Sequence, residues 1–295
     1  MTRTINTPRP GFISSNWFFL TATLITLLGA AVRINNLGFD SLWFDEVLTL
    51  NTAVQGFAAA AEVRDHPPLL YWLTSFSISS FPTHEVTLRL PSLIAGILTI
   101  PLLITFGKTM GLPSAGLWAG FLLAISPFHV RYAQEARHYA LLLFFALLSL
   151  NFLYRALSRK NWQDWLIYGA VTSVLLFIHY SAWLLLFAEG LLIVGWLIVL
   201  LRRRDYPSLT AIWPVVVLLL LTLLILLPRA YSAFQANTGQ ITAVGTTQAV
   251  NLQTWVRSAW ISFGFNDPLL AALLLLLALA GLLILAYRRH WLTLT

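Results

Sequence analysis

The sequence predicts an all-α protein, a polytopic membrane helix bundle of about eight transmembrane helices. Hydrophobic residues make up 58% of the 295-residue chain and charged residues only 10%, so the apolar surface exceeds what one soluble core of this size can bury. Apolar runs of membrane-spanning length recur between short polar segments. The chain contains no cysteine, which excludes disulfides and thiolate metal sites.

The expected spans follow from these apolar runs. No small-residue cleavage site follows the first run, so we expect a retained first helix and not a removed signal peptide. The runs of sufficient length lie at residues 17–35, 88–107, 114–129, 138–155, 163–178, 181–201, 209–228 and 268–287.

A shorter apolar stretch at residues 67–80 decides the topology. It begins at Pro67-Pro68 and is too short to cross the bilayer comfortably, so we expect a re-entrant or surface helix in the first external loop, residues 36–87. We expect a single transmembrane module over residues 1–295, with a second external loop at 229–267. Polar amides and aromatics alternate in that second loop; they suit contacts with a sugar, and an ordinary interfacial aromatic belt explains them equally well.

Charge distribution gives the expected orientation. If the 67–80 stretch does not cross, most Lys and Arg residues fall on one side, which the positive-inside tendency makes cytoplasmic, and both termini lie there. The isoelectric point near 10.1 therefore reflects topology, and nucleic acid is not an expected partner. The opposite, extracytoplasmic face collects a polar set: Asp45, Glu46, Asp65, His66, Arg89, Arg131, Glu135, Arg137 and His179.

Two adjacent acids, Asp45 and Glu46, directly follow the first span. An ionised carboxylate at the edge of hydrocarbon costs several kcal/mol unless a partner or a function holds it there. A pair of solvated loop acids is the alternative. The pair is also a candidate ligand set for a divalent cation, although no clear further ligands are spaced nearby, and no motif requires any other cofactor.

Two further polar segments belong to the predicted site. Asp65-His66-Pro67-Pro68 holds an acid and an imidazole at a defined entry to a helix, although a simple Asp cap explains it too. The second segment contains Arg131, Gln134, Glu135, Arg137 and Tyr139. On a helix Arg131, Gln134, Arg137 and His138 would share a face. Arginine suits a phosphate because its planar fork stays charged; arginines that snorkel to lipid headgroups are the alternative.

Four ordered motifs carry a family resemblance. They are Leu42-Trp43-Phe44-Asp45-Glu46, Asp65-His66-Pro67-Pro68-Leu69, Arg89-Leu90-Pro91-Ser92, and Ser126-Pro127 followed by Gln134-Glu135-Ala136-Arg137 and Tyr139. Over about residues 25–145 the chain resembles the GT-C fold glycosyltransferases of the protein-mannosyltransferase and lipid A aminoarabinose-transferase type. The resemblance implies transfer of a sugar from a polyprenyl-phosphate donor to a lipid, glycan or protein acceptor on the extracytoplasmic side of the cell membrane.

The same resemblance assigns roles to individual residues. Asp45 is the implied catalytic base, with Glu46 beside it. Asp65 and His66 are implied to lie near acceptor and phosphate, and Arg131 and Arg137, with Arg89, would bind the phosphate. A single displacement with one base and no covalent enzyme intermediate would invert the configuration of the sugar at C1.

A different class of function stays open: a lipid-phosphate-binding or transport protein without chemistry, as a shortened or degenerate family member. Such a protein should carry polar residues in several spans. Away from the ends of the predicted spans the only acid is Glu189, which is either functional or paired with a neighbouring helix. Substitution of Asp45 by Asn separates the two classes, because only a transferase needs the base.

Overall fold

The computed structural model describes residues 15–63, 66–204 and 210–243, and in these residues every regular element is a helix. This confirms the all-α fold class. The chain divides into two compact units. The first contains Pro68–Asn151 and the chain up to Ala61, and the second contains Glu62–Pro67 and the chain from Phe152.

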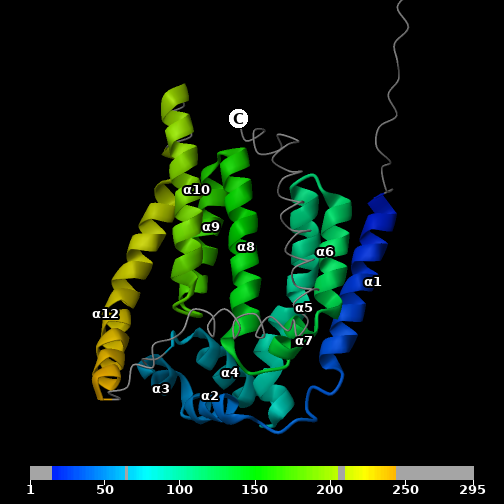
Figure 1. The fold of residues 1–295 in the computed structure, drawn as a ribbon, viewed down its shortest axis with the longest axis vertical. Helices are drawn as coiled ribbons and strands as arrows, with labels where there is room; N and C mark the ends of the chain where they lie inside the picture. Colours follow the sequence, from blue (N-terminus) through cyan, green and yellow to red (C-terminus); the bar gives the residue numbers. More distant parts are fainter. Residues whose placement is uncertain (1–14, 64–65, 205–209, 244–295) are drawn as a thin grey trace, which may run out of the picture. The chain divides into compact units, whose positions relative to one another are not determined.

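The first unit is built on three packed helices. Helices α1 (Ser15–Ile34), α5 (Glu85–Thr109) and α6 (Pro113–Ile125) pack against one another (Figure 1). Their buried core consists of Phe18, Ile25, Ile100, Ile104 and Ala124. Apolar residues on the outer side of α1 stay exposed, as expected of a helix that faces lipid.

Small residues let α5 and α6 approach closely. A Cβ atom on Gly107 would lie 2.5 Å from the Cα of Gly116, and one on Gly116 would lie 2.6 Å from the carbonyl oxygen of Ile104. Backbone atoms cannot move aside as the end of a side chain can. Glycine at these two positions therefore sets the distance between the helices.

We expect Gly116→Val to lower the free energy of unfolding by about 1–3 kcal/mol, because the added side chain must push the α5 backbone away. The matched control is Gly190→Val in α10 (Ala182–Arg203), where a Cβ would meet no atom within 4 Å. Thermal unfolding in detergent, followed by circular dichroism, measures both variants. Equal midpoints for the two would contradict the close packing.

Four short helices lie mainly in the first unit: α2 (Phe44–Val54), α3 (Gly56–Glu62), α4 (Leu69–Ser80) and α7 (Pro127–Ala133). Helix α4 packs on α5, and α2 packs on α4. With 12 residues, α4 is roughly 18 Å long, well short of the hydrocarbon thickness of a bilayer. The structure thus confirms a helix too short to cross at residues 69–80, and its orientation in the membrane remains a prediction.

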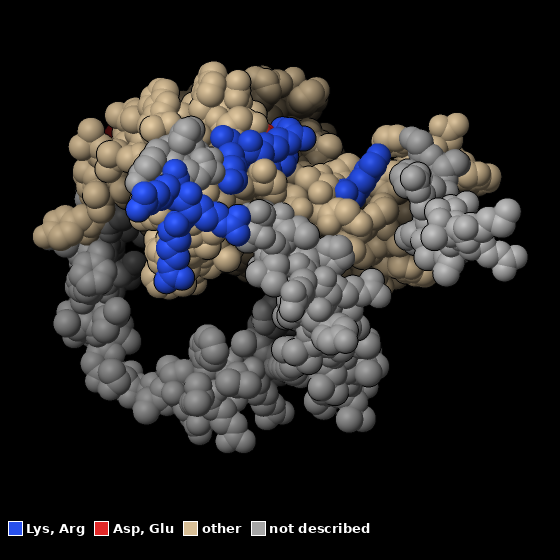
Figure 2. Space-filling view, turned by 90° about the horizontal axis from the view of Figure 1, so that it is seen from above, with Lys and Arg blue, Asp and Glu red and all other residues tan. Residues whose placement is uncertain are grey.

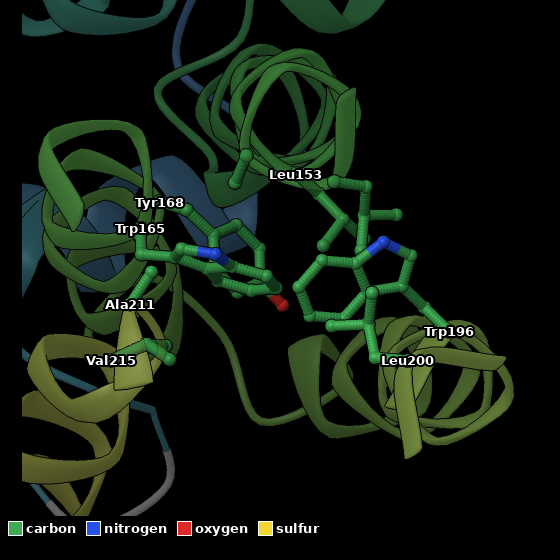
Figure 3. Close-up of a cluster of buried hydrophobic side chains, with 9 residues drawn as sticks. Leu153, Trp165, Tyr168, Trp196, Leu200, Ala211 and Val215 are labelled. Atoms are coloured by element: carbon green, nitrogen blue, oxygen red, sulfur yellow. The ribbon is translucent and has the colours of Figure 1, made fainter. Parts of the chain in front are cut away.

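The second unit contains α9 (Trp162–Leu176), α10, α12 (Trp213–Ala243) and the end of α8 (His138–Arg159). Aromatic rings from α9 and α10 form the centre of its core, where the ring centroids of Trp165 and Trp196 lie 5.4 Å apart. Leu153 and Val215 close the cluster from α8 and α12 (Figure 3). In the same unit the Tyr168 hydroxyl donates to the buried Glu189 carboxylate at 2.9 Å, so this acid is paired with a neighbouring helix.

The expected spans are confirmed in part. Four helices in the described part of the chain are long and apolar enough to cross a membrane, namely α1, α5, α8 and α10, and α6 and residues 213–228 of α12 are shorter apolar segments. Helix α9 has 15 residues. The expected span at 268–287 lies outside the described residues, as does the loop beyond residue 243, whereas residues 229–243 continue α12 past Pro228. The count of about eight spans and the single module remain predictions.

The expected helix at 114–129 is wrong at its end. Helix α6 stops at Ile125, and α7 begins at Pro127 with the Ser126 hydroxyl accepting from the backbone N–H of His129 at 3.4 Å. Proline has no N–H to continue the α6 hydrogen bonds, and serine before proline is a favourable start for a new helix. Ser126-Pro127 therefore divides one apolar run into two helices.

Candidate active site

Glu46 and Arg89 form a buried ion pair at the centre of the site. The Arg89 Nε and Nη2 atoms donate to the two Glu46 carboxylate oxygens at 2.9 and 2.8 Å, and the Glu46 side chain has no exposed surface. The backbone N–H of Ala136 donates to the same carboxylate at 2.8 Å, and that of Trp43 at 3.4 Å. Four donors thus hold Glu46, and both of its oxygens have partners.

The rest of the Arg89 guanidinium is bound by the backbone. Nη1 donates to the carbonyls of Leu37 and Asp40 at 2.6 and 3.1 Å, and Nη2 to that of Ser41 at 3.5 Å. A buried ion pair is tolerated when such bonds satisfy its remaining donors and acceptors. Arg89 therefore joins the loop before α2 to α5, and its described contacts leave no nitrogen for a phosphate.

Asp45, one residue earlier on α2, has a different environment. Its carboxylate is 29% exposed and meets the Arg137 Nη2 at 3.3 Å. The Arg137 side chain is 10% exposed, and its buried Nε has no hydrogen-bond partner in the described residues. A guanidinium that is nearly buried and incompletely bonded can bind an anion.

The predicted stripe of Arg131, Gln134, Arg137 and His138 on one helix is wrong. Helix α7 ends at Ala133 and α8 begins at His138. Residues 134–137 lie between the helices because their backbone groups bond elsewhere: the Ala136 N–H to Glu46, and the Arg137 carbonyl to the Ser92 hydroxyl at 2.9 Å. These bonds replace the helical ones and direct Arg137 toward Asp45.

The other predicted residues of this segment lie around the pair. Arg131 donates to Glu135 at 2.9 Å and is 76% exposed; burial raises the pKa of the Glu135 carboxyl, and the hydrogen bond from Arg131 opposes this rise. The Tyr132 ring packs edge-on against the exposed Tyr139, with centroids 4.6 Å apart. Gln134 donates to the carbonyls of Arg33 and Asn35 at 3.0 and 2.8 Å, so its described bonds are within the protein.

The last two predicted residues are Asp65 and His66. Asp65 lies outside the described residues. His66 belongs to the second unit, where its ring centroid lies 5.4 Å from that of His179. Among the described residues no group of three or more His, Asp or Glu could hold a metal ion, and Glu46 is occupied by nitrogen donors.

Two residues that sequence reasoning did not assign to the site lie beneath it. Arg33, at the end of α1, is fully buried, and its Nη2 lies 2.6 Å from the Nδ1 of His129. Burial, with a contribution from the Arg33 charge, lowers the pKa of His129 to about 4, so His129 is neutral at physiological pH and accepts this hydrogen bond. The sequence feature that could have pointed to Arg33 is a single charged residue at the end of an otherwise apolar span.

This environment makes stability depend on pH. Between pH 6.5 and the folded pKa of about 4, the unfolded chain binds a proton at His129 that the folded chain excludes, at about 1.4 kcal/mol per pH unit. Stability is therefore complete above pH 6.5 and falls as pH decreases. We expect the free energy of unfolding to drop by about 2 kcal/mol from pH 7 to pH 5 through this residue. His129→Gln should abolish that component in detergent unfolding titrations; an unchanged pH dependence would contradict the assignment.

Comparison with known proteins identifies the family. The sequence profile described as "Dolichyl-phosphate-mannose-protein mannosyltransferase" matches residues 65–232, more than half of the chain. The chain belongs to this family. The match includes Arg89 and the segment from Arg131 to Tyr139, and it begins after Asp45 and Glu46. It confirms the resemblance to GT-C glycosyltransferases and supports glycosyltransferase activity in a multi-pass membrane protein.

A curated relative agrees with this assignment. The chain is 37% identical over 164 residues to the protein named "Putative mannosyltransferase YkcB" of Bacillus subtilis (strain 168). The alignment covers 49% of this chain and 21% of the relative, so the chain spans about a fifth of the length of the curated relative it matches. No solved structure matches the chain.

Proposed function

We propose that this family member transfers a sugar from a polyprenyl-phosphate carrier to an acceptor hydroxyl at the extracytoplasmic face of the cell membrane. The observation that carries the proposal is the contrast between two adjacent acids. The buried Glu46 carboxylate accepts hydrogen bonds from four donors. The Asp45 carboxylate is partly exposed and meets the Arg137 guanidinium, whose Nε has no hydrogen-bond partner in the described residues. The buried Glu46–Arg89 pair fixes α2 and suits a structural role for Glu46. The more exposed Asp45–Arg137 pair beside it suits a catalytic role for Asp45.

The proposed reaction is a single displacement. The Asp45 carboxylate accepts the proton of the acceptor hydroxyl as its oxygen attacks the sugar C1. The bond between C1 and the phosphate oxygen breaks, and the carrier phosphate leaves with the electron pair. Arg137, with its unpaired Nε, stabilises the growing negative charge, and Arg131 is a second cation at the exposed edge. The product therefore has the inverted configuration at C1.

Other residues have accessory roles in this proposal. The exposed Tyr139 and the neighbouring Tyr132 offer apolar ring faces and hydroxyls to a sugar or acceptor. For Asp65 and His66 the family resemblance alone implies a role, in binding the acceptor and the phosphate. Arg89, Glu46 and Gln134 support the site through bonds within the protein.

Charge at the two ends of α8 supports the proposed orientation. Its 22 residues extend roughly 33 Å, enough to cross the hydrocarbon core. It begins directly after Arg137 and ends at Arg159, close to Arg155. In the second unit the end of α10 adds Arg202, Arg203 and Arg204. Figure 2 shows Lys and Arg side chains at the surface of the molecule seen from above. The positive-inside tendency makes that end cytoplasmic and the Asp45 end extracytoplasmic.

The experiment is a transfer assay with a panel of radiolabelled polyprenyl-phosphate sugars. Membranes that contain the chain are compared with membranes from the same cells without it, and label is followed into lipid, glycan and protein fractions. We expect incorporation from at least one donor only when the chain is present. Donor binding without any incorporation would overturn the proposal and favour a lipid-phosphate-binding protein.

A further inference from the structure

We infer that Arg33 and Gln134 form a reciprocal clasp that positions Arg137 for catalysis; this inference rests on the proposed function. The clasp joins the end of α1 to the α6–α7 break by side chains that each donate to backbone carbonyls of the other segment. Neither residue contacts the Asp45 carboxylate in the described contacts. Both are therefore positioning residues.

The first half of the clasp is the buried Arg33 side chain. Nη1 donates to the Ala124 carbonyl and Nη2 to the Leu123 carbonyl, both at 2.9 Å. These carbonyls belong to the last turn of α6, where Pro127 cannot supply the next helical N–H. The Leu123 carbonyl also accepts from the Ser126 N–H at 3.3 Å, whereas the described donor to the Ala124 carbonyl is Arg33. Arg33 thus satisfies a carbonyl that would be costly to leave unpaired inside the protein.

The acceptors of the Arg33 guanidinium are backbone carbonyls and an imidazole nitrogen, and none is a carboxylate. No salt bridge to Arg33 is present in the described part of the chain, and its remaining bonds go to the Gly29 carbonyl at 2.9 Å and to His129. The neutral His129 ring comes from α7 itself. One guanidinium therefore holds the end of α6 and the middle of α7 against α1.

The second half is Gln134, directly after α7. Its amide donates to the carbonyls of Arg33 and Asn35, where α1 ends and its last carbonyls lack helical donors. Close packing supports the clasp, because a Cβ on Gly96 of α5 would contact the Ala133 side chain. The end of α7 is therefore fixed between α1 and α5.

The fixed end of α7 restricts the next three residues of the chain, which lead into the site. Two residues after Gln134, the N–H of Ala136 donates to Glu46. The next residue is Arg137, whose guanidinium meets Asp45. With the end of α7 fixed, these residues have little freedom, and the single 3.3 Å contact between Arg137 and Asp45 can persist without further bonds. A loosened clasp should misplace Arg137 although no residue of the reaction has changed.

Amide hydrogen exchange of the intact protein tests the clasp without requiring activity. The variants are Arg33→Lys, which keeps a charge but cannot form the forked bonds, and Gln134→Leu. The control is Arg155→Lys, which weakens a bond to Asp164 of 2.8 Å in the second unit. We expect exchange over residues 126–137 to accelerate at least about tenfold in both clasp variants and to stay unchanged over residues 162–176. The control should give the opposite pattern. Uniform acceleration, or none over residues 126–137, overturns the clasp.

A kinetic double-mutant cycle tests whether the clasp acts through Arg137. We expect Arg33→Lys to lower kcat/KM at least about tenfold in the wild-type background and less than about threefold when Arg137→Lys is already present, because the positioned group is then lost. General destabilisation would multiply the two losses, and that result overturns the positioning role. A wild-type chain without transfer activity would refute the proposed function instead, and the exchange experiment would still decide on the clasp.

Discussion

Asp45→Asn is expected to lower kcat by about 10²–10⁴ and to leave donor binding largely intact. Asparagine keeps the size of the side chain but cannot accept the acceptor proton, and a positioned general base contributes an acceleration of that order. Arg137 loses a partially exposed partner but can still meet the carrier phosphate. Initial rates of transfer and equilibrium binding of the labelled donor, measured in the same membranes, separate the two effects.

The control for this substitution is Asp40→Asn. Asp40 is an exposed acid five residues earlier, and its hydrogen bond from Arg89 is accepted by its backbone carbonyl. We expect it to retain near wild-type turnover. Similar losses in both variants would indicate that charge in this loop matters and that Asp45 has no special role.

Arg89→Leu is expected to destabilise the protein by about 3–5 kcal/mol, because it leaves the Glu46 carboxylate buried without its cation. The loss should include the bonds that Arg89 gives to the carbonyls of residues 37, 40 and 41. Unfolding of the purified protein by a denaturing detergent measures the change. Activity should fall with the folded fraction, since the pair fixes α2.

The matched variant is Arg131→Leu, which removes the other arginine that pairs with a glutamate in this unit. Because Arg131 is 76% exposed, water screens the pair, and we expect a change of no more than about 1 kcal/mol. Comparable stability losses in the two variants would show that burial does not distinguish the pairs and would remove the structural role given to Glu46.

The all-α fold and the approximate positions of α1, α5, α8 and α10 could be predicted, because long apolar runs indicate such helices. The break between α6 and α7 was not predicted. The run at 114–129 is apolar throughout, and the helix is interrupted because Pro127 has no backbone N–H. The path of residues 134–137 depends on bonds to Glu46 and Ser92, which are about 45 to 90 residues away in the chain. Local propensity contains no information about such partners.

For the site, the residue types could be predicted better than their roles. Asp45 and Glu46 are neighbours with the same charge, and they point in directions about 100° apart on α2. One carboxylate is buried and the other is 29% exposed. Arg89 matched a phosphate ligand in sequence, yet its described donors are all taken up within the protein. Arg33 was assigned no role from the sequence, because its burial and its bonds to the end of α6 are visible only in three dimensions.

The anomeric configuration of the transferred sugar tests most directly the central claim, that one carboxylate at position 45 performs the transfer in a single displacement. The wild-type chain is incubated with the donor identified in the panel, and the configuration at C1 is determined by NMR in donor and product. The account predicts inversion. Retention would require a second displacement through a covalent intermediate, and it would contradict the assignment of Asp45 as a general base acting alone.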